Sequence, residues 1–306
     1  MKKVPSLLLK SFVSLALLSL LFYQVDWDEL RRLIVTVDWL LLAGGLFCVA
    51  VGVVLSSFKW RIILRVDGID SPLSTLVRVY LIGIFFNNFL PTSIGGDAVR
   101  AYYISREFGR PSVGVSSILA ERITGLLVLA LFPVVAFYPS EMSMPGSVQG
   151  GLCGLVGLTL LAGILVLPPV RKSWFRLLPF RVKNAMEHVV GSLEQYLSDT
   201  RKLTVVILCS ILFNGLMILA AWFVAAALGL DLRMIDLMVV VPLVVLLTLI
   251  PFSLNGLGIR EGGFIFFLAD FGVGGTQALS FSLLNYSFVL VLSLVGGGLF
   301  ALRRIR

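Results

Sequence analysis

Two short polar stretches interrupt the apolar runs of this chain and combine the residue types from which a binding site could be built. The first, NNFLPTSIGGDAVR, covers residues 87–100, and the second, PFSLNGLGIR, covers residues 251–260. The second repeats the later part of the first without a gap, 160 positions further on. The matching residues are Pro91, Ser93, Gly96 and Arg100, which recur as Pro251, Ser253, Gly256 and Arg260. The repetition predicts two related polar turns.

The order of residue types in each stretch is typical of an anion-binding turn. A proline ends one helix, and the following glycines allow a sharp change of direction. The backbone amides that open the next helix attract a negative charge. Arg100 and Arg260 follow closely, and a guanidinium can hold a phosphate through two parallel hydrogen bonds. An anionic lipid headgroup, or another anion, would fit such a turn.

Charged residues inside an apolar run extend the candidate site. Glu121 and Arg122 lie within the apolar stretch 113–138, where charges are costly and usually mark a pathway. We expect Asn87, Asn88 and Asn255 to act as hydrogen-bonding clamps at the turns. The expected substrate-binding set comprises Asn87, Asn88, Ser93, Gly95, Gly96, Asp97, Arg100, Glu121, Arg122, Asn255, Gly256, Gly258, Arg260 and Glu261.

The same charges could instead form a structural network. Arg100 could pair with Asp97, one turn back, or with Glu121. Arg260 could pair with the neighbours of Glu261. Glu121 could carry a coupling proton or simply neutralise an arginine. Because Glu121 and Arg122 are adjacent on a helix, their side chains point to different sides, and each needs its own partner.

The composition predicts an all-α, polytopic integral membrane protein. The chain has 306 residues, of which 58% are hydrophobic and 14% charged, too few polar groups to cover a water-soluble globule. Apolar stretches of about twenty residues recur, and each could cross the hydrocarbon layer as a helix. We expect one membrane domain, residues 1–306, with about six full spans plus two re-entrant hairpins, or about eight spans.

The basic residues predict the orientation. The net charge of +8 reflects clusters at the ends of apolar runs, which favours membrane orientation over nucleic-acid binding. Lys59, Arg61 and Arg65 follow the span that begins at Trp39, and residues 171–200 form a basic amphipathic segment. We expect these groups, and both termini, on the cytoplasmic side of the plasma membrane of a bacterium or archaeon.

The charge rule also predicts hairpins. If residues 73–90 crossed completely, the basic segment 171–183 would lie outside, contrary to the rule. A hairpin that turns at the first motif avoids this conflict, and the basic C-terminus requires a second one. Residues 39–138 and 203–302 then form an inverted repeat, and the two turns meet near the middle of the membrane, as in many secondary transporters.

These motifs resemble a known family. The quoted segments are NNFLPTSIGGDAVRAYYISR (87–106), ERITGLL (121–127) and LNGLGIREGGF (254–264), which are similar to signature segments of the lysylphosphatidylglycerol synthase transmembrane-region family, also called flippase-like domain proteins. The resemblance covers nearly the whole chain. In the full synthase a soluble aminoacyl-transferase domain follows, and we expect this chain to lack it. The resemblance therefore implies lipid binding or translocation.

No enzyme motif stands out, and we expect no catalytic residue, cofactor or metal. The leading hypothesis is a flippase-like protein that translocates an anionic or zwitterionic lipid, with the lipid headgroup as partner and a homo-oligomer possible. A membrane glycosyltransferase or another lipid-modifying enzyme is the second hypothesis. A proton-coupled transporter of a small anion is the third.

Overall fold

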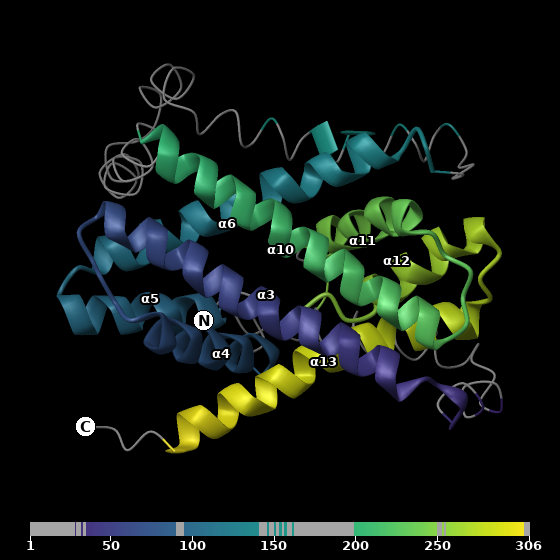
Figure 1. Cartoon of the computed structure of the whole chain (residues 1–306), viewed down its shortest axis with the longest axis horizontal. Coiled ribbons are helices and arrows are strands. Elements are labelled where there is room, and N and C mark those ends of the chain that lie inside the picture. The colour runs from purple at the N-terminus through teal and green to yellow at the C-terminus, as the bar shows by residue number, and fades with distance from the viewer. Residues whose placement is uncertain are drawn as a thin grey trace, which may run out of the picture.

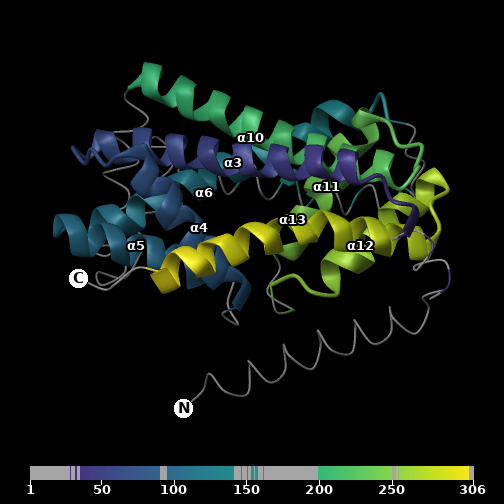
Figure 2. The same cartoon turned by 60° about the horizontal axis from the view of Figure 1, so that its bottom comes forward.

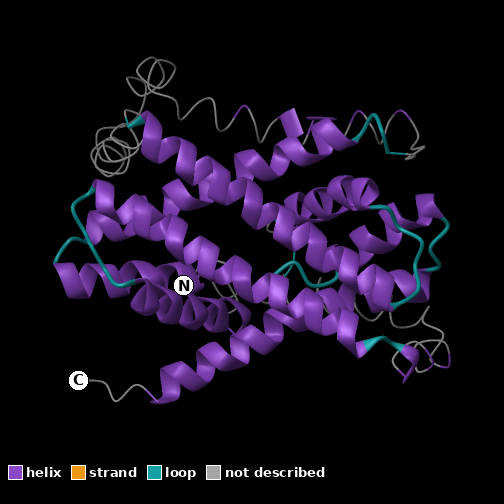
Figure 3. Ribbon diagram, viewed as in Figure 1, coloured by secondary structure: helices purple, strands orange, loops and turns teal. Residues whose placement is uncertain are grey.

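A computed structural model describes residues 35–89, 95–140, 199–249, 253 and 255–302, with a few single positions between them. Within these residues every regular element is a helix (Figure 3). Ser93, Pro91 and Pro251 lie outside the described residues, and so do the apolar stretch 6–23, most of the apolar stretch 150–168 and nearly all of the segment 171–200.

Four long helices are apolar enough to cross a membrane. They are α3 (Trp39–Val66), α6 (Pro111–Ala136), α10 (Thr200–Ala227) and α13 (Gly275–Leu302). Each has 26 or 28 residues, which exceeds the roughly 20 residues that a bilayer requires. The all-α, polytopic membrane class predicted from the sequence is therefore confirmed.

Two pairs of shorter helices complete the described structure. The first hairpin consists of α4 (Leu73–Phe89) and α5 (Gly95–Phe108), which pack against each other. The second consists of α11 (Met234–Thr248) and α12 (Ile259–Leu268), followed by the 3-10 turn η2 (Ala269–Phe271). A helix of 17 residues such as α4 is about 25 Å long, less than the hydrocarbon thickness of about 30 Å. The lengths alone are compatible with turns inside a bilayer.

The two halves of the chain pack in corresponding ways. The first helices of the halves, α3 and α10, lie side by side and antiparallel (Figure 1), and the Asp38 amide before α3 donates to the Ala227 carbonyl at the end of α10, at 3.4 Å. The first hairpin packs through α4 against α13, and the second packs through α11 against α6. Each hairpin therefore contacts the last helix of the other half of the chain.

The hairpins lie at opposite ends of the molecule. Figures 1 and 2 show α4 and α5 toward one end of the long axis and α11 and α12 toward the other. Basic side chains lie at the base of the first hairpin: Arg65, in the last turn of α3, binds Asp70 at 3.0 Å, and Arg110 donates to the Asp67 carbonyl at 2.9 Å. This end is where the sequence predicts the cytoplasm.

One expected boundary is corrected by the structure. The span that begins at Trp39 is expected to end before Lys59, but α3 continues to Val66. Lys59 therefore lies inside the helix, and it is buried rather than part of a loop. The reason is that Trp60, Ile63 and Leu64 beyond it are also buried, so the packed face of α3 extends past the charge.

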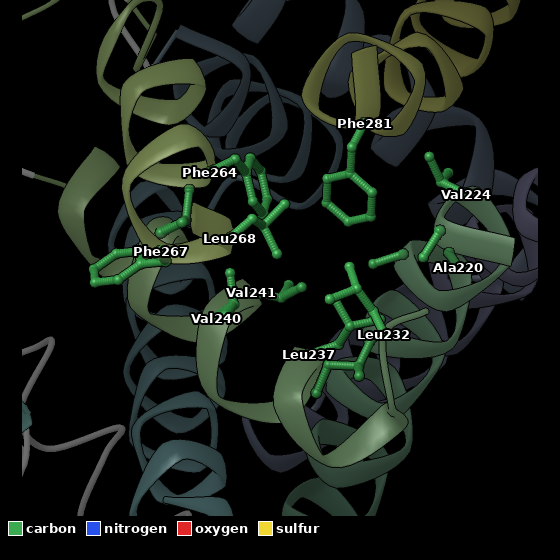
Figure 4. Close-up of a cluster of buried hydrophobic side chains, with 14 of the residues drawn as sticks. Ala220, Val224, Leu232, Leu237, Val240, Val241, Phe264, Phe267, Leu268 and Phe281 are labelled. Carbon is green, nitrogen blue, oxygen red and sulfur yellow. The ribbon is translucent and has the colours of Figure 1, made fainter. Parts of the chain in front are cut away.

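The largest apolar cluster holds the second hairpin. Leu237 and Val240 of α11, Phe264 of α12 and Phe281 of α13 point into it (Figure 4). A smaller cluster around Trp60, Leu76, Ile104 and Ile118 holds the first hairpin against α3 and α6. The second hairpin is thus held by the larger apolar cluster and the first by the smaller one.

Candidate functional site

Five charged side chains meet between α3, α5 and α6, and we call them the charge cluster: Lys59, Asp97, Arg100, Glu121 and Arg122. Lys59 and Arg100 are each 3% exposed and Glu121 is 5% exposed. Burying charges so completely is costly unless they are paired. The cluster holds three cations and two carboxylates, so one positive charge is in excess.

Arg100 is fixed on several sides. Its guanidinium donates to the Glu121 carboxylate of α6 and, at 3.4 Å, to Asp97 in its own helix. The rings of Trp60 and Tyr80 lie on it, with centroids 4.3 and 4.2 Å from the guanidinium carbon. Arg100 thus ties α5 to α3, α4 and α6, as the network alternative expected.

The neighbours of Arg100 complete the network. Glu121 also accepts a hydrogen bond from the Tyr80 hydroxyl at 3.1 Å. Arg122 turns away from Glu121 and binds the second oxygen of Asp97 at 2.9 Å, while half of its side chain stays exposed. Glu121 and Arg122 therefore have separate partners, as their adjacent positions require, and Asp97 joins two arginines.

Lys59 is the member of the cluster that sequence reasoning missed. Its Nζ donates to the backbone carbonyl of Glu121 at 3.1 Å and to the Ser210 hydroxyl of α10 at 3.2 Å. Among the described residues no carboxylate lies within 4 Å of it. A sequence signal existed, because Gly45, Gly52 and Ser56 form a small-residue face of α3 whose helical spacing continues to Lys59.

A pocket of about 280 Å³ opens beside this lysine, between α3, α4, α6, α10 and α11. Its polar wall is formed by Ser56, Lys59, Tyr80, Glu121, Arg122 and Asn214. The remaining wall is largely apolar and includes Leu129, Phe213, Met217 and Val245. The pocket is therefore lined by both charged and apolar side chains, and helices of both halves contribute to it.

A second group of residues joins the two motifs. The Asn88 side-chain carbonyl at the end of α4 accepts from Asn255 at 3.2 Å and from the Tyr286 hydroxyl at 3.0 Å. The guanidinium of Arg260 lies over the Tyr286 ring, 3.7 Å from its centroid. We call Asn88, Asn255, Arg260 and Tyr286 the tip junction. Two residues 167 positions apart in the sequence meet there, one from each motif.

Arg260 has a local acidic partner. Its guanidinium binds the carboxylate of Glu261, the next residue, and Glu261 also accepts from the Gly258 amide at 2.7 Å. The side chain of Glu261 is 1% exposed, whereas that of Arg260 is 15% exposed. Arg260 is therefore paired within its own helix and keeps part of its surface accessible.

The glycines and the remaining asparagine shape the two turns. The Asn87 side chain accepts from the Gly96 amide at 2.7 Å, which links α4 to the start of α5 just after Gly95. A Cβ on Gly96 would lie 1.9 Å from the Gly83 carbonyl oxygen, so only glycine permits this approach. In the second turn Gly256 and Gly258 have φ values of +76° and +84°. This left-handed conformation favours glycine.

The expected site residues thus fall into two groups. Asp97, Arg100, Glu121 and Arg122 lie in the charge cluster, while Asn88, Asn255 and Arg260 lie in the tip junction. Among the described residues no hydrogen bond or ion pair joins Arg100 to Arg260. Ser253, beside the second turn, is buried, and its hydroxyl has no partner within the described part of the chain.

Buried charges among long apolar helices and two broken helical pairs define a polytopic membrane protein with a polar interior. The chain belongs to the family described as the lysylphosphatidylglycerol synthase TM region, whose model matches residues 7–297. The resemblance seen in the motifs is therefore confirmed as family membership.

Two archaeal relatives have similar sequences. A UPF0104 membrane protein of Methanothermobacter thermautotrophicus is 24% identical over 307 residues, which cover 90% of this chain and 87% of the relative. A UPF0104 membrane protein of Methanocaldococcus jannaschii is 28% identical over 134 residues, 42% of this chain and 38% of that protein. No solved structure matches the chain.

Proposed function

We propose that the protein binds the headgroup of an anionic or zwitterionic phospholipid and carries the lipid from one leaflet to the other. The observation that carries this proposal is the tip junction, where Asn88 of the first motif meets Asn255 of the second. Each asparagine belongs to a hairpin from a different end of the molecule. A headgroup at this junction would be reachable from either side if one hairpin or the other moved.

The packing of the two halves supports such a movement. Inverted repeats allow a carrier to open alternately, because the same contacts can form and break on either side of a central site. The exchange of hairpins between the halves, α4 onto α13 and α11 onto α6, is what two repeats related by a two-fold axis would give. The proposed carrier would alternate by shifting one half against the other.

The electrostatics support an anionic substrate. The charge cluster has one more cation than carboxylates, and Arg260 adds a partly accessible guanidinium at the junction. A surplus cation in a membrane interior is stabilised by a negative ligand. A phosphodiester supplies one negative charge, and the acyl chains of the lipid can stay in the bilayer.

The proposed orientation follows from the described basic loops. Arg61, Arg65 and Arg110 lie at the base of the first hairpin, which we place in the cytoplasm of a prokaryotic cell. Asp38 and Asp231, at the opposite ends of the helices, then face outward. A cysteine introduced at Arg110 should react with a membrane-impermeant reagent only after the membrane is opened.

Transport itself can be tested in proteoliposomes. A fluorescent phosphatidylglycerol is placed in both leaflets, and dithionite added outside bleaches the lipid that reaches the outer leaflet. Arg260→Ala should reduce the protein-dependent bleaching to the level of empty vesicles. Lys202→Ala, which removes the basic partner of an exposed ion pair with Asp199, should leave the rate of bleaching unchanged. Equal rates for the wild type and Arg260→Ala would refute the proposed role.

A further inference from the structure

The surplus positive charge of the charge cluster can be traced to Lys59, which lines a pocket away from the tip junction. Lys59 is almost fully buried, yet its ammonium donates to two neutral oxygens, and no carboxylate of the described residues lies within 4 Å of it. Arg100, by contrast, has Glu121 and Asp97. A buried ammonium is stabilised best by a negative partner, so a cation with only neutral partners that faces an open pocket indicates a missing anion.

The charges around the pocket favour a single negative charge. Lys59, Arg122 and Glu121 line it, and the nearest charges behind them, Arg100 and Asp97, cancel each other. One positive charge is therefore left for a ligand. A phosphodiester carries one negative charge and matches it, and the side chains of Ser56 and Asn214 lie in the same wall to contact its oxygens.

The shape of the pocket favours a ligand with an apolar part. Besides the polar residues, the apolar side chains of Leu129, Phe213, Met217 and Ile218 line the space. The pocket also reaches the surface, because it includes Val245, which is 38% exposed, and the half-exposed side chain of Arg122. A free phosphate would leave the apolar wall in contact with water, whereas a lipid would cover it.

We infer that the pocket between α3, α6, α10 and α11 is a binding site for a phosphodiester headgroup with its attached apolar chain, in which Lys59 is the principal ligand. The site is distinct from the tip junction. Its role as a station on the transport path rests on the proposed function, but binding to it does not and can be measured separately.

The test uses the full chain, purified in a neutral detergent, and native mass spectrometry to count bound lipid. Dihexanoyl phosphatidylglycerol is the probe, with dihexanoyl phosphatidylcholine and inorganic phosphate as the comparison arms. Lys59→Gln should weaken phosphatidylglycerol binding about tenfold or more, because a hydrogen bond to a charged group is lost. Arg61→Gln, two residues further along the same helix and paired with exposed Asp70, is the matched control and should bind normally.

A second variant blocks the pocket without removing any charge. Gly125 lines the pocket, and a Cβ there would meet only the Lys59 ammonium, at 3.6 Å, which is an ordinary contact. Gly125→Leu should therefore fill the space in front of Lys59. Because replacing a glycine within a helix favours the helix, the variant should unfold at the same temperature as the wild type or higher. Lost binding would then not be a folding defect.

The outcomes separate the inference from the proposed function. Wild-type binding in both Lys59→Gln and Gly125→Leu would overturn the site, as would equal binding of inorganic phosphate and phosphatidylglycerol. Equal binding of phosphatidylcholine would overturn its preference for an anion. Loss of binding in both variants supports the site whether or not lipid moves. If Arg260→Ala then binds normally but the wild type moves no lipid, the carrier fails and the pocket stands.

Discussion

The two hairpins carry the same motif but place its arginine in different surroundings. Arg100 is buried between two aromatic rings, and its carboxylate partner, Glu121, comes from a different helix. Arg260 rests on one ring, is partly exposed, and pairs with the neighbouring residue Glu261. One arginine connects helices, and the other belongs to a single helix at the junction between the motifs.

The difference shows that the matching arginines of the two motifs need not have the same role. The second hairpin is held by a large apolar cluster around Phe264 and Phe281 and does not depend on Arg260 for its packing. The first hairpin is held by a smaller apolar cluster, and Arg100 supplies ties that apolar contacts do not. The contacts give Arg100 a structural role, and we propose that Arg260 is the arginine that meets a ligand.

The largest expected effect is on the stability of the first hairpin. Arg100→Ala leaves the Glu121 carboxylate buried without its main partner, which costs about 3–5 kcal/mol in buried pairs. We expect a marked fall in the thermal unfolding temperature in detergent. Arg260→Ala should cause a smaller fall, because the Gly258 amide still binds Glu261.

A double variant separates pairing from packing. Arg100→Met combined with Glu121→Leu removes both charges and should recover much of the stability that Arg100→Ala loses, since apolar replacements of a buried pair are often tolerated. If the double variant were less stable than either single variant, Arg100 would be held by more than its ion pairs. The same cycle on Arg260 and Glu261 should show a weaker coupling.

Glycine substitutions extend the comparison to the backbone. Gly96→Ala forces α5 away from the Gly83 carbonyl of α4, and overpacking of this kind costs about 1–3 kcal/mol. Gly262 in α12 has no atom within 4 Å of the added Cβ, so Gly262→Ala should be neutral or slightly stabilising. Thermal unfolding of the two variants measures this directly. Equal losses would show that the second hairpin is as tightly packed as the first.

The contact between the hairpins has a smaller expected energy. Asn88→Ala and Asn255→Ala each remove one side of a hydrogen bond, worth about 1 kcal/mol net. Their double-mutant cycle should give a positive coupling, because the residues touch although they are 167 positions apart. Tyr286→Phe, which keeps the ring under Arg260 but loses the hydroxyl, serves as the comparison. Strict additivity would mean that the motifs do not meet.

Much of the fold could be predicted from the sequence because apolar length is a strong signal. The apolar stretch 113–138 differs from α6 by only a few residues at each end. The expected second half, 203–302, begins within a few residues of the start of α10 and ends with α13. The glycine-rich turns also marked both hairpins. That Glu121 and Arg122 have separate partners followed from a simple rule, since adjacent residues on a helix face different ways.

The rest depended on where helices pack, which local patterns do not determine. Lys59 follows an apolar run and is close to Arg61 and Arg65, so the charge rule assigned it to a loop. Its burial arises because Ser210 of α10 and the Glu121 carbonyl of α6 lie against it, contacts with residues 62 and 151 positions away. Tyr286 was missed for the same reason, since its partners Asn255 and Asn88 are 31 and 198 positions away in the sequence.

The smallest expected effect concerns the loops that lead into each hairpin. Asp70 before α4 is exposed, and hydrogen bonds from Arg65 and then Arg61 hold the pKa of its carboxyl below the usual value. Asp236 at the start of α11 is 3% exposed and binds the Arg233 side chain at 2.9 Å. We expect Asp70→Asn to leave the unfolding temperature at neutral pH almost unchanged, and Asp236→Asn to cost about 1 kcal/mol.

The acid side of the pH profile sharpens this last contrast. Because the folded pKa of Asp70 lies below its unfolded value, the carboxylate stabilises the fold above the unfolded pKa, and this contribution is lost as the pH falls through the folded pKa. The unfolding temperatures of wild type and Asp70→Asn should therefore converge in acid. A large fall in the unfolding temperature of Asp70→Asn at neutral pH would contradict this prediction. It would show that exposed ion pairs stabilise the start of the first hairpin as much as buried ones stabilise the second.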